Sequence, residues 1–367
     1  MGGERLGVRA AIVHDWFQGY HGAERTVEAI RTGLFAPGSE PDVFTFHAAR
    51  ELLPPGLAGA IVRESRLSRL PGIRQVAHDP GHWRRLLPLM PRYFRSLDLS
   101  PYQLVIATSH AFAVQARPRA GARYLCYCFT PLRYAWMPEA DPRLRALGGW
   151  LRRIDLEASR RPDAYAAISS AVRARIRHFY GRDAEIIHPP VDVDEIPLGV
   201  EKDPQLFLWA HRLVAYKRPE AVAEAFRDLP YQLTMVGVGP LERKLRASLP
   251  PNVELRPWLA RDELAALFAR SAGFLHLGEE DFGISMVEAL AAGTPVIALG
   301  RGGATEIVRD GVDGIPVADA EPARVRDAVR RVAAQTWDRR ALRARAEEFS
   351  RERFLERLRA YGASLLD

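Results

Sequence analysis

The strongest constraint on the fold of this chain is a repeated alternation of short, apolar, β-rich runs with longer helical patterns. In the first series the β-rich runs cover 10–13, 104–108, 123–129, 164–168 and 185–187, and the helical patterns cover 23–34, 154–160 and 170–179. Such an alternation is typical of parallel βαβ units whose helices cover both faces of a sheet.

The alternation restarts after a polar, proline-containing stretch at 192–204. The second series has β-rich runs at 206–210, 232–236, 253–256, 273–277 and 295–298, and helical patterns at 219–226, 241–247, 261–270, 285–292, 321–334 and 339–366. The sequence therefore predicts an α/β protein of two Rossmann-like domains with doubly wound parallel sheets. The predicted domains are 1–195 and 196–349, with a C-terminal helix at 350–367 that packs back onto the first domain.

The net charge of +7 comes entirely from the first half of the chain. Residues 1–200 hold 27 basic and 20 acidic side chains, whereas residues 201–367 hold 25 of each. The first half therefore favours an anionic partner, such as an acidic membrane face, a phosphorylated substrate or nucleic acid, unless it only reflects an arginine-rich proteome. Nucleic acid is disfavoured because the chain has no recognised binding motif and no aromatic platform among its arginines.

One segment, residues 63–95, concentrates this charge. It holds eight arginines against Glu64 and Asp79, interleaved with Trp83, Tyr93 and Phe94. Such a mixture can dock on an anionic inner-membrane surface or hold a lipid-linked diphosphate. The alternative is a solvated helical face.

Other sequence features indicate a cytoplasmic protein. No run approaches the roughly 18 apolar residues of a membrane span, and the N-terminus lacks the apolar core and cleavage site of a secretory signal. The two cysteines, Cys126 and Cys128, are too few for a zinc site and are expected to be buried, reduced thiols.

Four groups of polar or glycine residues follow predicted strands. Two open α/β domains in series bind their ligands at such strand ends, in the cleft between the domains. After the first strand, Gly19 and Gly22 let a ligand approach the backbone at a helix N-terminus, or form a plain turn. Gly19 and Gly22 do not form the G-x-G-x-x-G motif of dinucleotide-binding sites, and Gly237-Val238-Gly239 lacks the third glycine of that motif. His110 follows the strand at 104–108, where a contact to a reacting group competes with a purely structural role.

The third group lies directly after the strand at 206–210. Arg212 and Lys217 flank a loop that leads into a helix with Pro219 near its first turn. The planar fork of an arginine and the mobile point charge of a lysine together suit a diphosphate. The chain has only three lysines, so a lysine at this position favours a function over a solvated loop.

The fourth group is acidic and follows the strand at 273–277. Glu280 precedes a predicted helix and Glu288 lies about two turns into that pattern, near Gly293. The amides of 282–285 would face outward from the helix N-terminus as a phosphate cradle, beside carboxylates that accept hydrogen bonds from sugar hydroxyls. Helix capping by Glu280 and a solvated Glu288 form the alternative.

No cofactor or metal site is predicted. Asp192 and Asp194 superficially resemble a divalent-metal pair. They lie, however, in the linker after Pro189-Pro190 rather than at a strand end.

At these residues the chain resembles the large family 4 of glycosyltransferases, over nearly its whole length. The Arg212…Lys217 loop and the Glu280-x7-Glu288 spacing look like the two defining signatures of that family, followed by the similar segments 302–308 and 310–314. The N-terminal segments 14–16, 22–25, 108–112 and 126–136 resemble a bacterial subgroup of mannosyltransferases that assemble surface polysaccharides.

The resemblance implies a GT-B fold, with two Rossmann-like domains facing a central cleft, and a retaining, metal-independent transfer from a nucleotide sugar. It implies that Arg212 and Lys217 neutralise the leaving diphosphate and that Glu288 binds the ribose hydroxyls. It further implies that the donor sugar is held by Glu280 and by the amides of Phe282, Gly283 and Ile284. Gly22 would let the N-terminal loop approach the diphosphate, and His110 would contact the reacting sugar. The sequence departs from the family in the separation of Gly19 from Gly22 and in His211, which stands where a small residue is common.

The reaction expected from this resemblance is an α-hexosyl transfer, with GDP-mannose as donor and a glycan or polyprenyl-diphosphate-linked acceptor. Arg133, Tyr134 and Trp136 are the candidate acceptor residues. No pair of carboxylates clearly offers a nucleophile, so same-face substitution is favoured over a covalent intermediate. The alternatives are a UDP-sugar with a soluble acceptor, a GT-B-like epimerase or pseudo-transferase and, remotely, a nucleic-acid-binding protein.

Overall fold

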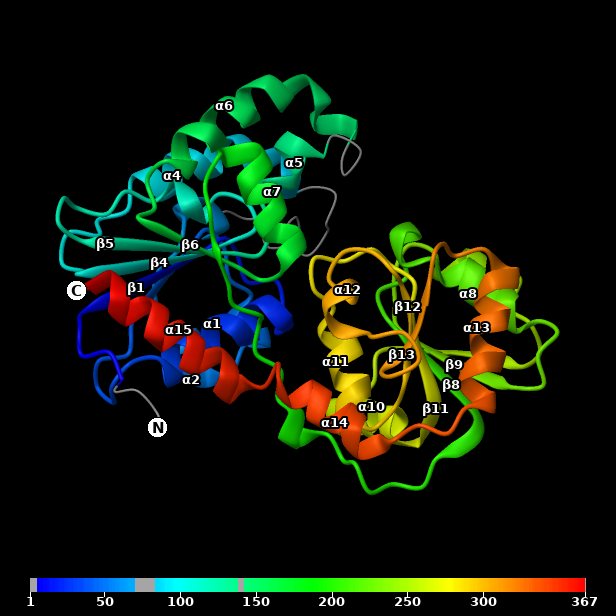
Figure 1. Cartoon of the computed structure of the whole chain (residues 1–367). Coiled ribbons are helices and arrows are strands. Elements are labelled where there is room, and N and C mark those ends of the chain that lie inside the picture. The colour runs from blue at the N-terminus through cyan, green and yellow to red at the C-terminus, as the bar shows by residue number, and fades with distance from the viewer. Residues whose placement is uncertain (1–4, 70–82, 138–141, 367) are drawn as a thin grey trace. The chain divides into compact units, whose positions relative to one another are not determined.

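The computed structural model describes residues 5–69, 83–137 and 142–366 of the chain (Figure 1). It consists of two compact units: unit 1 is Met1–Pro190 with Phe354–Asp367, and unit 2 is Val191–Arg353. The boundaries differ by about four or five residues from the predicted 195/196 and 349/350. The difference arises because Val191 bridges Ser350 and hydrogen-bonds Phe349, so the linker is part of unit 2.

Unit 1 contains a parallel sheet of seven strands in the order β3-β2-β1-β4-β5-β6-β7. The strands are β1 Ala10–His14, β2 Asp42–Thr45, β3 Ile61–Arg63, β4 Leu104–Ser109, β5 Arg123–Cys128, β6 Ala164–Ala167 and β7 Glu185–Ile186. The central strands are buried along almost their whole length, as near-continuous apolar runs such as Ala-Ala-Ile-Val require.

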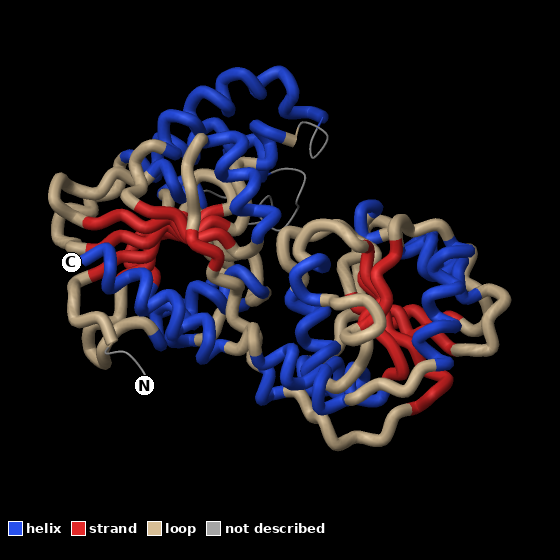
Figure 2. The backbone as a smooth tube through the Cα atoms, viewed as in Figure 1, coloured by secondary structure: helices blue, strands red, loops and turns tan. Residues whose placement is uncertain are grey.

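Helices cover both faces of this sheet, as Figure 2 shows. The helices are α1 Gly22–Gly33, α2 Pro55–Ala60, α4 Met90–Arg95, α5 Arg133–Trp136, α6 Gly148–Ser159, α7 Ser170–Tyr180 and α15 Arg351–Leu366. In Figure 1 α1, α2 and α15 lie on one face and α4, α6 and α7 on the other. Leu355 of α15 packs on Gly33 of α1, where an added Cβ would come within 2.4 Å of the leucine side chain.

Unit 2 contains a parallel sheet of six strands in the order β10-β9-β8-β11-β12-β13. The strands are β8 Asp203–Ala210, β9 Gln232–Val236, β10 Val253–Arg256, β11 Ser271–His276, β12 Val296–Leu299 and β13 Gly314–Val317. Its helices are α8 Pro219–Phe226, α9 Glu242–Arg246, α10 Arg261–Arg270, α11 Ile284–Ala291, α12 Ala304–Ile307, α13 Pro322–Ala334 and α14 Arg339–Glu347. Trp209, Phe207 and Phe226 are fully buried in its core.

The strand order places one topological switch point in each sheet. The chain leaves β1 toward β2 and later returns on the other side of β1 as β4, and it leaves β8 toward β9 and returns as β11. In open α/β sheets, ligands bind beyond the carboxyl ends of the strands at such points. The segments after β1 and β4 in unit 1, and after β8 and β11 in unit 2, are therefore the places to search for a site.

The structure corrects several predicted elements. The sequence missed strands β2, β3 and β13, and α6 begins at Gly148 rather than at 154. The region predicted to be helical over 339–366 consists of two helices, α14 and α15, which are separated next to the predicted 349/350 boundary because residues 349–350 hydrogen-bond or bridge to Val191. Cys126 and Cys128 are buried and neither is in a disulfide, as predicted.

Candidate functional site

The loop after β8 brings a lysine into the switch point of unit 2. His211 and Arg212 follow the strand, and a short 3-10 turn at Ala215–Lys217 leads to Pro219, the first residue of α8, as predicted. Arg218, between that turn and α8, has φ +58°, which is uncommon for a residue with a Cβ. The side chain of Arg212 is exposed, whereas that of Lys217 is turned inward and the residue is only 5% exposed.

Lys217 and Glu280, predicted from separate motifs, form an ion pair between Nζ and Oε1 across the switch point. Gly278, just after β11, makes this possible, because a Cβ there would lie 2.8 Å from the Lys217 Cδ. The ammonium also lies 5.5 Å from the centre of the Tyr216 ring. A lysine so deeply buried requires a charged or polar partner, and Glu280 supplies it.

Two buried histidines flank the ion pair. His211 Nδ1 lies 3.5 Å from Lys217 Nζ, and its Nε2 lies 3.3 Å from the Leu275 carbonyl, which assigns a neutral ring with the proton on Nε2. His276 Nε2 lies 3.4 Å from Glu280 Oε2. Burial holds the pKa of His211 well below its usual range, helped by Lys217, and lowers the pKa of His276 to about 4. Both rings are therefore neutral at pH 7.

The donor-sugar residues predicted from the sequence surround the start of α11. Gly283 has φ +106° and precedes Ile284, the first residue of the helix, whose first-turn N–H groups have no intrahelical acceptors. Phe282 is buried against Phe349, with ring centres 5.5 Å apart. Because residues 280–283 are not helical, Glu288 lies in the second turn of α11 rather than two full turns in.

Glu288 is already engaged by a cation. Its Oε1 lies 3.4 Å from Arg261 Nη1, and the same guanidinium donates to Glu195 at 2.5 Å and approaches Asp192 at 3.8 Å. Asp192 also pairs with Arg351, and Asp194 with Arg343. The two linker aspartates that resemble a metal pair are thus engaged by arginines.

Glycines unassigned by the sequence analysis support both halves of this site. Gly303 donates its N–H to the Glu280 carbonyl at 2.9 Å, and a Cβ at Gly303 would overlap the backbone of Phe282. A Cβ at Gly237, which has φ +150°, would lie 2.0 Å from the His211 carbonyl oxygen. Gly303 and Gly237 therefore allow the backbones of neighbouring loops to pack closely. This packing explains both glycines without a dinucleotide-binding motif.

Exposed apolar side chains lie on the loops at the same edge of the sheet. Tyr216 follows β8, Val238 follows β9 and Trp258 follows β10, and each is exposed. Large apolar side chains that stay exposed beside a polar site are available to cover the flat face of a ligand. No sequence pattern singled out these three residues, because each stands alone in a polar loop.

At the switch point of unit 1, the buried carboxylate of Asp15 holds the turn after β4. Its Oδ2 accepts the backbone N–H groups of His110 and Ala111 at 2.6 and 2.9 Å, and its Oδ1 those of Phe112 and Ala113 at 2.5 and 2.6 Å. Burial raises the pKa of Asp15, and the amide donors act in the opposite direction. Asp15 was not among the predicted site residues, although its place directly after β1 was a signal.

His110 is oriented by the same carboxylate. Its Nδ1 lies 3.3 Å from Asp15 Oδ2, and its ring meets the Trp16 ring edge to face at 4.5 Å. Burial, together with the Arg133 guanidinium, lowers the pKa of His110 to about 3, so the ring is neutral at pH 7. A proton on Nδ1 then points at Asp15 and leaves Nε2 as a hydrogen-bond acceptor.

The glycine loop of unit 1 leads into a capped helix. Gly22 is the first residue of α1, and the Glu24 side chain accepts the N–H of His21 at 2.9 Å. Burial raises the pKa of Glu24 to about 7. At Gly19 an added Cβ would lie 2.8 Å from the ring of His21, so Gly19 makes room for that side chain.

The three predicted acceptor residues occupy α5. Arg133 is exposed and Tyr134 is half-buried. Trp136 stacks on Phe179 with ring centres 4.6 Å apart and donates Nε1–H to Asp155 Oδ2 at 2.7 Å. Its ring therefore holds α5 against α6 and α7.

The arginine-rich segment lies partly outside the described residues, which omit 70–82. Of its aromatic residues, Phe94 is fully buried and Tyr93 donates its hydroxyl to the Thr45 carbonyl at 2.7 Å. These two rings pack α4 onto the sheet and are not displayed for membrane contact. Among the described residues, no helix is both long and apolar enough to cross a bilayer.

Two known families match the chain, one for each unit. Residues 20–195 match the family described as Glycosyltransferase Family 4, and residues 192–352 match the family described as Glycosyl transferases group 1. The two ranges meet close to the 190/191 division between the units.

Relatives of known name match a smaller part of the chain. A D-inositol 3-phosphate glycosyltransferase of Frankia alni is 36% identical over 169 residues, which are 41% of this chain and 42% of that protein. One of Mycobacterium bovis is 30% identical over 168 residues, 40% of this chain and 35% of that protein. The chain thus spans about two fifths of the length of these curated relatives.

Solved structures match over almost the whole chain. Anabaena HepE, in complex with UDP and glucose, has a TM-score of 0.71 at 18% identity, over 97% of this chain and 100% of that one. A glycosyltransferase from Rickettsia africae has a TM-score of 0.67 at 16% identity, over 99% of this chain and 100% of that one. These similarities, with the two parallel sheets, confirm the predicted fold class.

Proposed function

We propose that this chain, which carries the two domains of a GT-B glycosyltransferase of the family 4 type, moves a hexose from a nucleotide sugar to an acceptor hydroxyl. The observation that carries the proposal is the pair of Lys217 and Glu280 at the switch point of unit 2. A buried cation and a carboxylate at this edge provide one group for a leaving diphosphate and one for sugar hydroxyls.

The first step follows from the charge that develops as the donor breaks down. Departure of the nucleoside diphosphate leaves negative charge on its β-phosphate, and Lys217 and the exposed Arg212 are placed to neutralise it. In this proposal Lys217 exchanges Glu280 for the phosphate, and the freed carboxylate accepts hydrogen bonds from the sugar. The N–H groups of Gly283 and Ile284 at the start of α11 bind further sugar or phosphate oxygens.

We propose same-face substitution with retention and no metal or cofactor. The bond from the anomeric carbon to the phosphate oxygen breaks while a bond to the acceptor oxygen forms on the same face. The acceptor proton passes to the departing phosphate, so no protein base is consumed. The buried histidines beside the pair are neutral at pH 7 and do not add charge to the site.

Two other groups in unit 2 are proposed to bind the nucleoside. Glu288 binds the ribose hydroxyls, which requires it to loosen its 3.4 Å contact with Arg261. Trp258 and Val238 cover a face of the base, since both are exposed and apolar. In unit 1, His110 offers its Nε2 to a sugar hydroxyl and Gly22 lets the diphosphate approach the backbone.

The donor and the acceptor rest on different arguments. GDP-mannose with a glycan or polyprenyl-diphosphate-linked acceptor is the proposal drawn from the sequence resemblance. A UDP-sugar is the competing donor, because the similar HepE structure holds UDP and glucose. An inositol phosphate is the competing acceptor, because the curated relatives carry that name.

Ligand binding tests this proposal before any acceptor is known. Thermal unfolding of the whole chain is measured with GDP, UDP, ADP and an oligonucleotide, for the wild type and for Lys217→Ala. We expect one nucleoside diphosphate to raise the Tm of the wild type, and Lys217→Ala to lose most of that shift. The responding nucleoside diphosphate identifies the base of the donor.

The matched control is Lys244→Ala, which removes an exposed lysine that pairs with Glu220. It should keep the full response. The proposal is wrong if no nucleoside diphosphate stabilises the wild type, or if Lys217→Ala responds as strongly as the control does. A response to the oligonucleotide alone would instead support nucleic-acid binding.

A further inference from the structure

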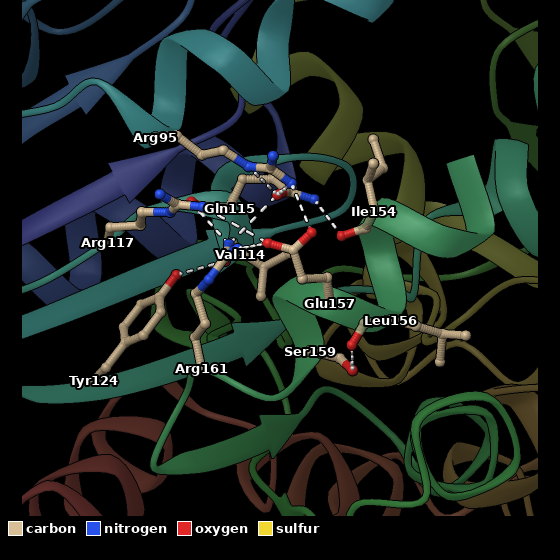
Figure 3. Close-up of polar contacts among 10 residues, drawn as sticks. All are labelled: Arg95, Val114, Gln115, Arg117, Tyr124, Ile154, Leu156, Glu157, Ser159 and Arg161. Carbon is tan, nitrogen blue, oxygen red and sulfur yellow. Dashed lines mark hydrogen bonds and ion pairs between the residues drawn. The ribbon is translucent and has the colours of Figure 1, made fainter. Parts of the chain in front are cut away.

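Three arginines of unit 1 converge on a single carboxylate. Arg95 ends α4, Arg117 follows β4 on the loop toward β5, and Arg161 follows α6. Figure 3 shows their guanidinium groups directed toward Glu157 on α6. The nitrogen-to-oxygen distances to the Glu157 carboxylate are 3.7, 3.6 and 2.6 Å, in the order Arg95, Arg117, Arg161.

A buried amide holds two of these arginines in place. Gln115 is fully buried, and its Oε1 accepts Nε and Nη2 of Arg95 at 3.0 and 2.8 Å and Nη1 of Arg161 at 3.4 Å. Its own Nε2 donates to the Ile154 carbonyl at 2.9 Å, which fixes the orientation of the amide (Figure 3). The guanidinium groups of Arg95 and Arg161 are thus positioned by Gln115 as well as by Glu157.

The charges of this cluster do not balance. Three guanidinium groups face one carboxylate, and the C-terminal end of α6 contributes about half a negative charge. Burial and the neighbouring guanidiniums of Arg117 and Arg95 lower the pKa of Arg161, which reports the crowding of like charges. More than one positive charge is left without a counter-charge among the described residues.

We propose that Arg95, Arg117 and Arg161 form a binding site for a phosphate group, which Glu157 closes from within when no ligand is bound. Arginine forks bind the oxygens of phosphate in pairs, and a phosphate dianion matches the excess charge. Glu157 is the part that can leave, because its side chain is 53% exposed and Gln115 keeps two of the arginines oriented without it. Arg117, also 53% exposed, forms the outer side of the site.

This site is separate from the proposed transfer reaction. Its residues belong to α4, α6 and the loop before β5, and none of them is a residue assigned to the donor. It accounts for part of the excess of basic residues in the first half of the chain. The phosphate group could be a free phosphate or the phosphomonoester of a lipid, and both present a phosphate dianion to the arginines.

The test measures binding of inorganic phosphate by calorimetry, on the full chain with Lys217→Ala as background so that the donor site contributes little. We expect saturable binding, weakened about tenfold by Arg117→Ala. Glu157→Gln should tighten it at least threefold, because the competing carboxylate is removed. Arg119→Ala, an exposed arginine on the same loop, is the matched control and should leave binding unchanged.

A second arm distinguishes the two sources. Sedimentation with vesicles that contain phosphatidic acid, whose headgroup is a phosphomonoester, is compared for the same variants. Binding of free phosphate that depends on Arg117 supports a soluble ligand, and binding of vesicles alone that depends on Arg117 supports a lipid headgroup. The proposal is overturned if neither phosphate nor vesicles bind, if Arg117→Ala and Arg119→Ala weaken binding equally, or if Glu157→Gln weakens it. Because Arg117 and Arg119 are exposed, both variants are expected to fold, which unfolding curves check.

Discussion

Three buried carboxyl groups of unit 1 and three buried or half-buried carboxyl groups of unit 2 have different kinds of partner. In unit 1 the hydrogen-bond donors to Asp15, Glu24 and Asp155 are neutral: backbone N–H groups, the Trp136 indole and the Tyr180 hydroxyl. In unit 2 the partners of Glu280, Glu288 and Asp313 are the cations Lys217, Arg261 and Arg309. The first half of the chain carries the excess of arginines, so cationic partners would be expected there. These three carboxyl groups of unit 1 nevertheless have neutral donors, and the three of unit 2 have cations.

The difference separates carboxylates that hold the fold from carboxylates that can serve a ligand. The four amides on Asp15 belong to one turn of the backbone, so Asp15 cannot change partners without unfolding that turn. The ion pair of Lys217 and Glu280 opens by rotation of side chains, and each partner is then available to a phosphate or a hydroxyl. We expect substitutions in the first class to reduce stability and those in the second to reduce turnover.

The largest effect is expected from Asp15→Ala. The substitution leaves the four buried amides of 110–113 without an acceptor and should lower the free energy of unfolding by about 4 kcal/mol. Glu280→Gln should cost only about 1 kcal/mol, because the side chain is partly exposed, its amide oxygen remains an acceptor for the Lys217 ammonium, and its loop is held by Gly303. Urea denaturation measures both, and equal losses would remove the distinction between the units.

Lys217→Ala should reduce turnover strongly and stability only slightly. Without the ammonium at the leaving diphosphate, kcat is expected to fall roughly 10²–10³-fold, while the folded structure is kept. The measurement is turnover of nucleotide sugars that carry the base identified by thermal shift, with circular dichroism as the check on folding. Lys244→Ala should retain wild-type turnover, and a similar loss in both variants would point to charge in general rather than to the switch point.

The buried carboxyl group of Asp155 in unit 1 should make the stability of the folded chain depend on pH. Burial raises the pKa of Asp155 from 3.8 to about 7, so between these values the native state keeps a proton that the unfolded state releases. The contribution of Asp155 to stability therefore falls as pH rises from about 4 to 7, with a slope approaching 1.4 kcal/mol per pH unit. Glu24 acts in the same direction, since its pKa is also raised to about 7.

The check is Asp155→Asn, which keeps an oxygen acceptor for Trp136 and Tyr180 but cannot ionise. Urea unfolding between pH 5 and 8 should show the variant gaining stability relative to the wild type as pH rises to 7, because the opposite contribution of the buried neutral histidines is common to both proteins. An unchanged slope would show that Asp155 is ionised in the folded protein throughout this range.

The smallest effect is expected from Gly278→Ala. The added Cβ would lie 2.8 Å from Lys217 Cδ and push the lysine away from Glu280. We expect kcat to fall about tenfold with little change in the Tm. The control is Gly199→Ala, at a position with open space around it, which should leave both kcat and the Tm unchanged. Equal kcat values for both variants would mean that the position of the ammonium is not critical.

The sequence predicted the central strands and the two-domain division more accurately than the edges. Strands β1, β4, β5, β8 and β9 are buried apolar runs, which are readable without the rest of the fold. The edge strand β3 exposes Val62 and Arg63, so its pattern resembled a loop. The break between α14 and α15 depends on the pairing of Ser350 with Val191, which no local pattern reports.

The prediction of the candidate site was limited in the same way, because contacts between segments distant in sequence could not be read from local patterns. Lys217 and Glu280 were each recognisable as residues after a strand, but their meeting depends on β8 and β11 being neighbours. Asp15 was visible after β1, yet its role requires the path of the turn at 110–113, which comes from tertiary structure. Glu288 was recognised by spacing, whereas its contact with Arg261 on α10 required the packing of two helices.

The placement of α15 has a consequence for how the protein is made. Unit 1 is discontinuous in sequence, because Phe354–Asp367 belongs to it while Val191–Arg353 forms unit 2. On the ribosome, all of unit 2 is synthesised before the helix whose Leu355 packs on Gly33. The usual order, in which the N-terminal domain is completed first, is therefore inverted. Until α15 emerges, the nascent sheet of unit 1 has the apolar surface around Gly33 and Tyr127 uncovered, a surface that chaperones would recognise.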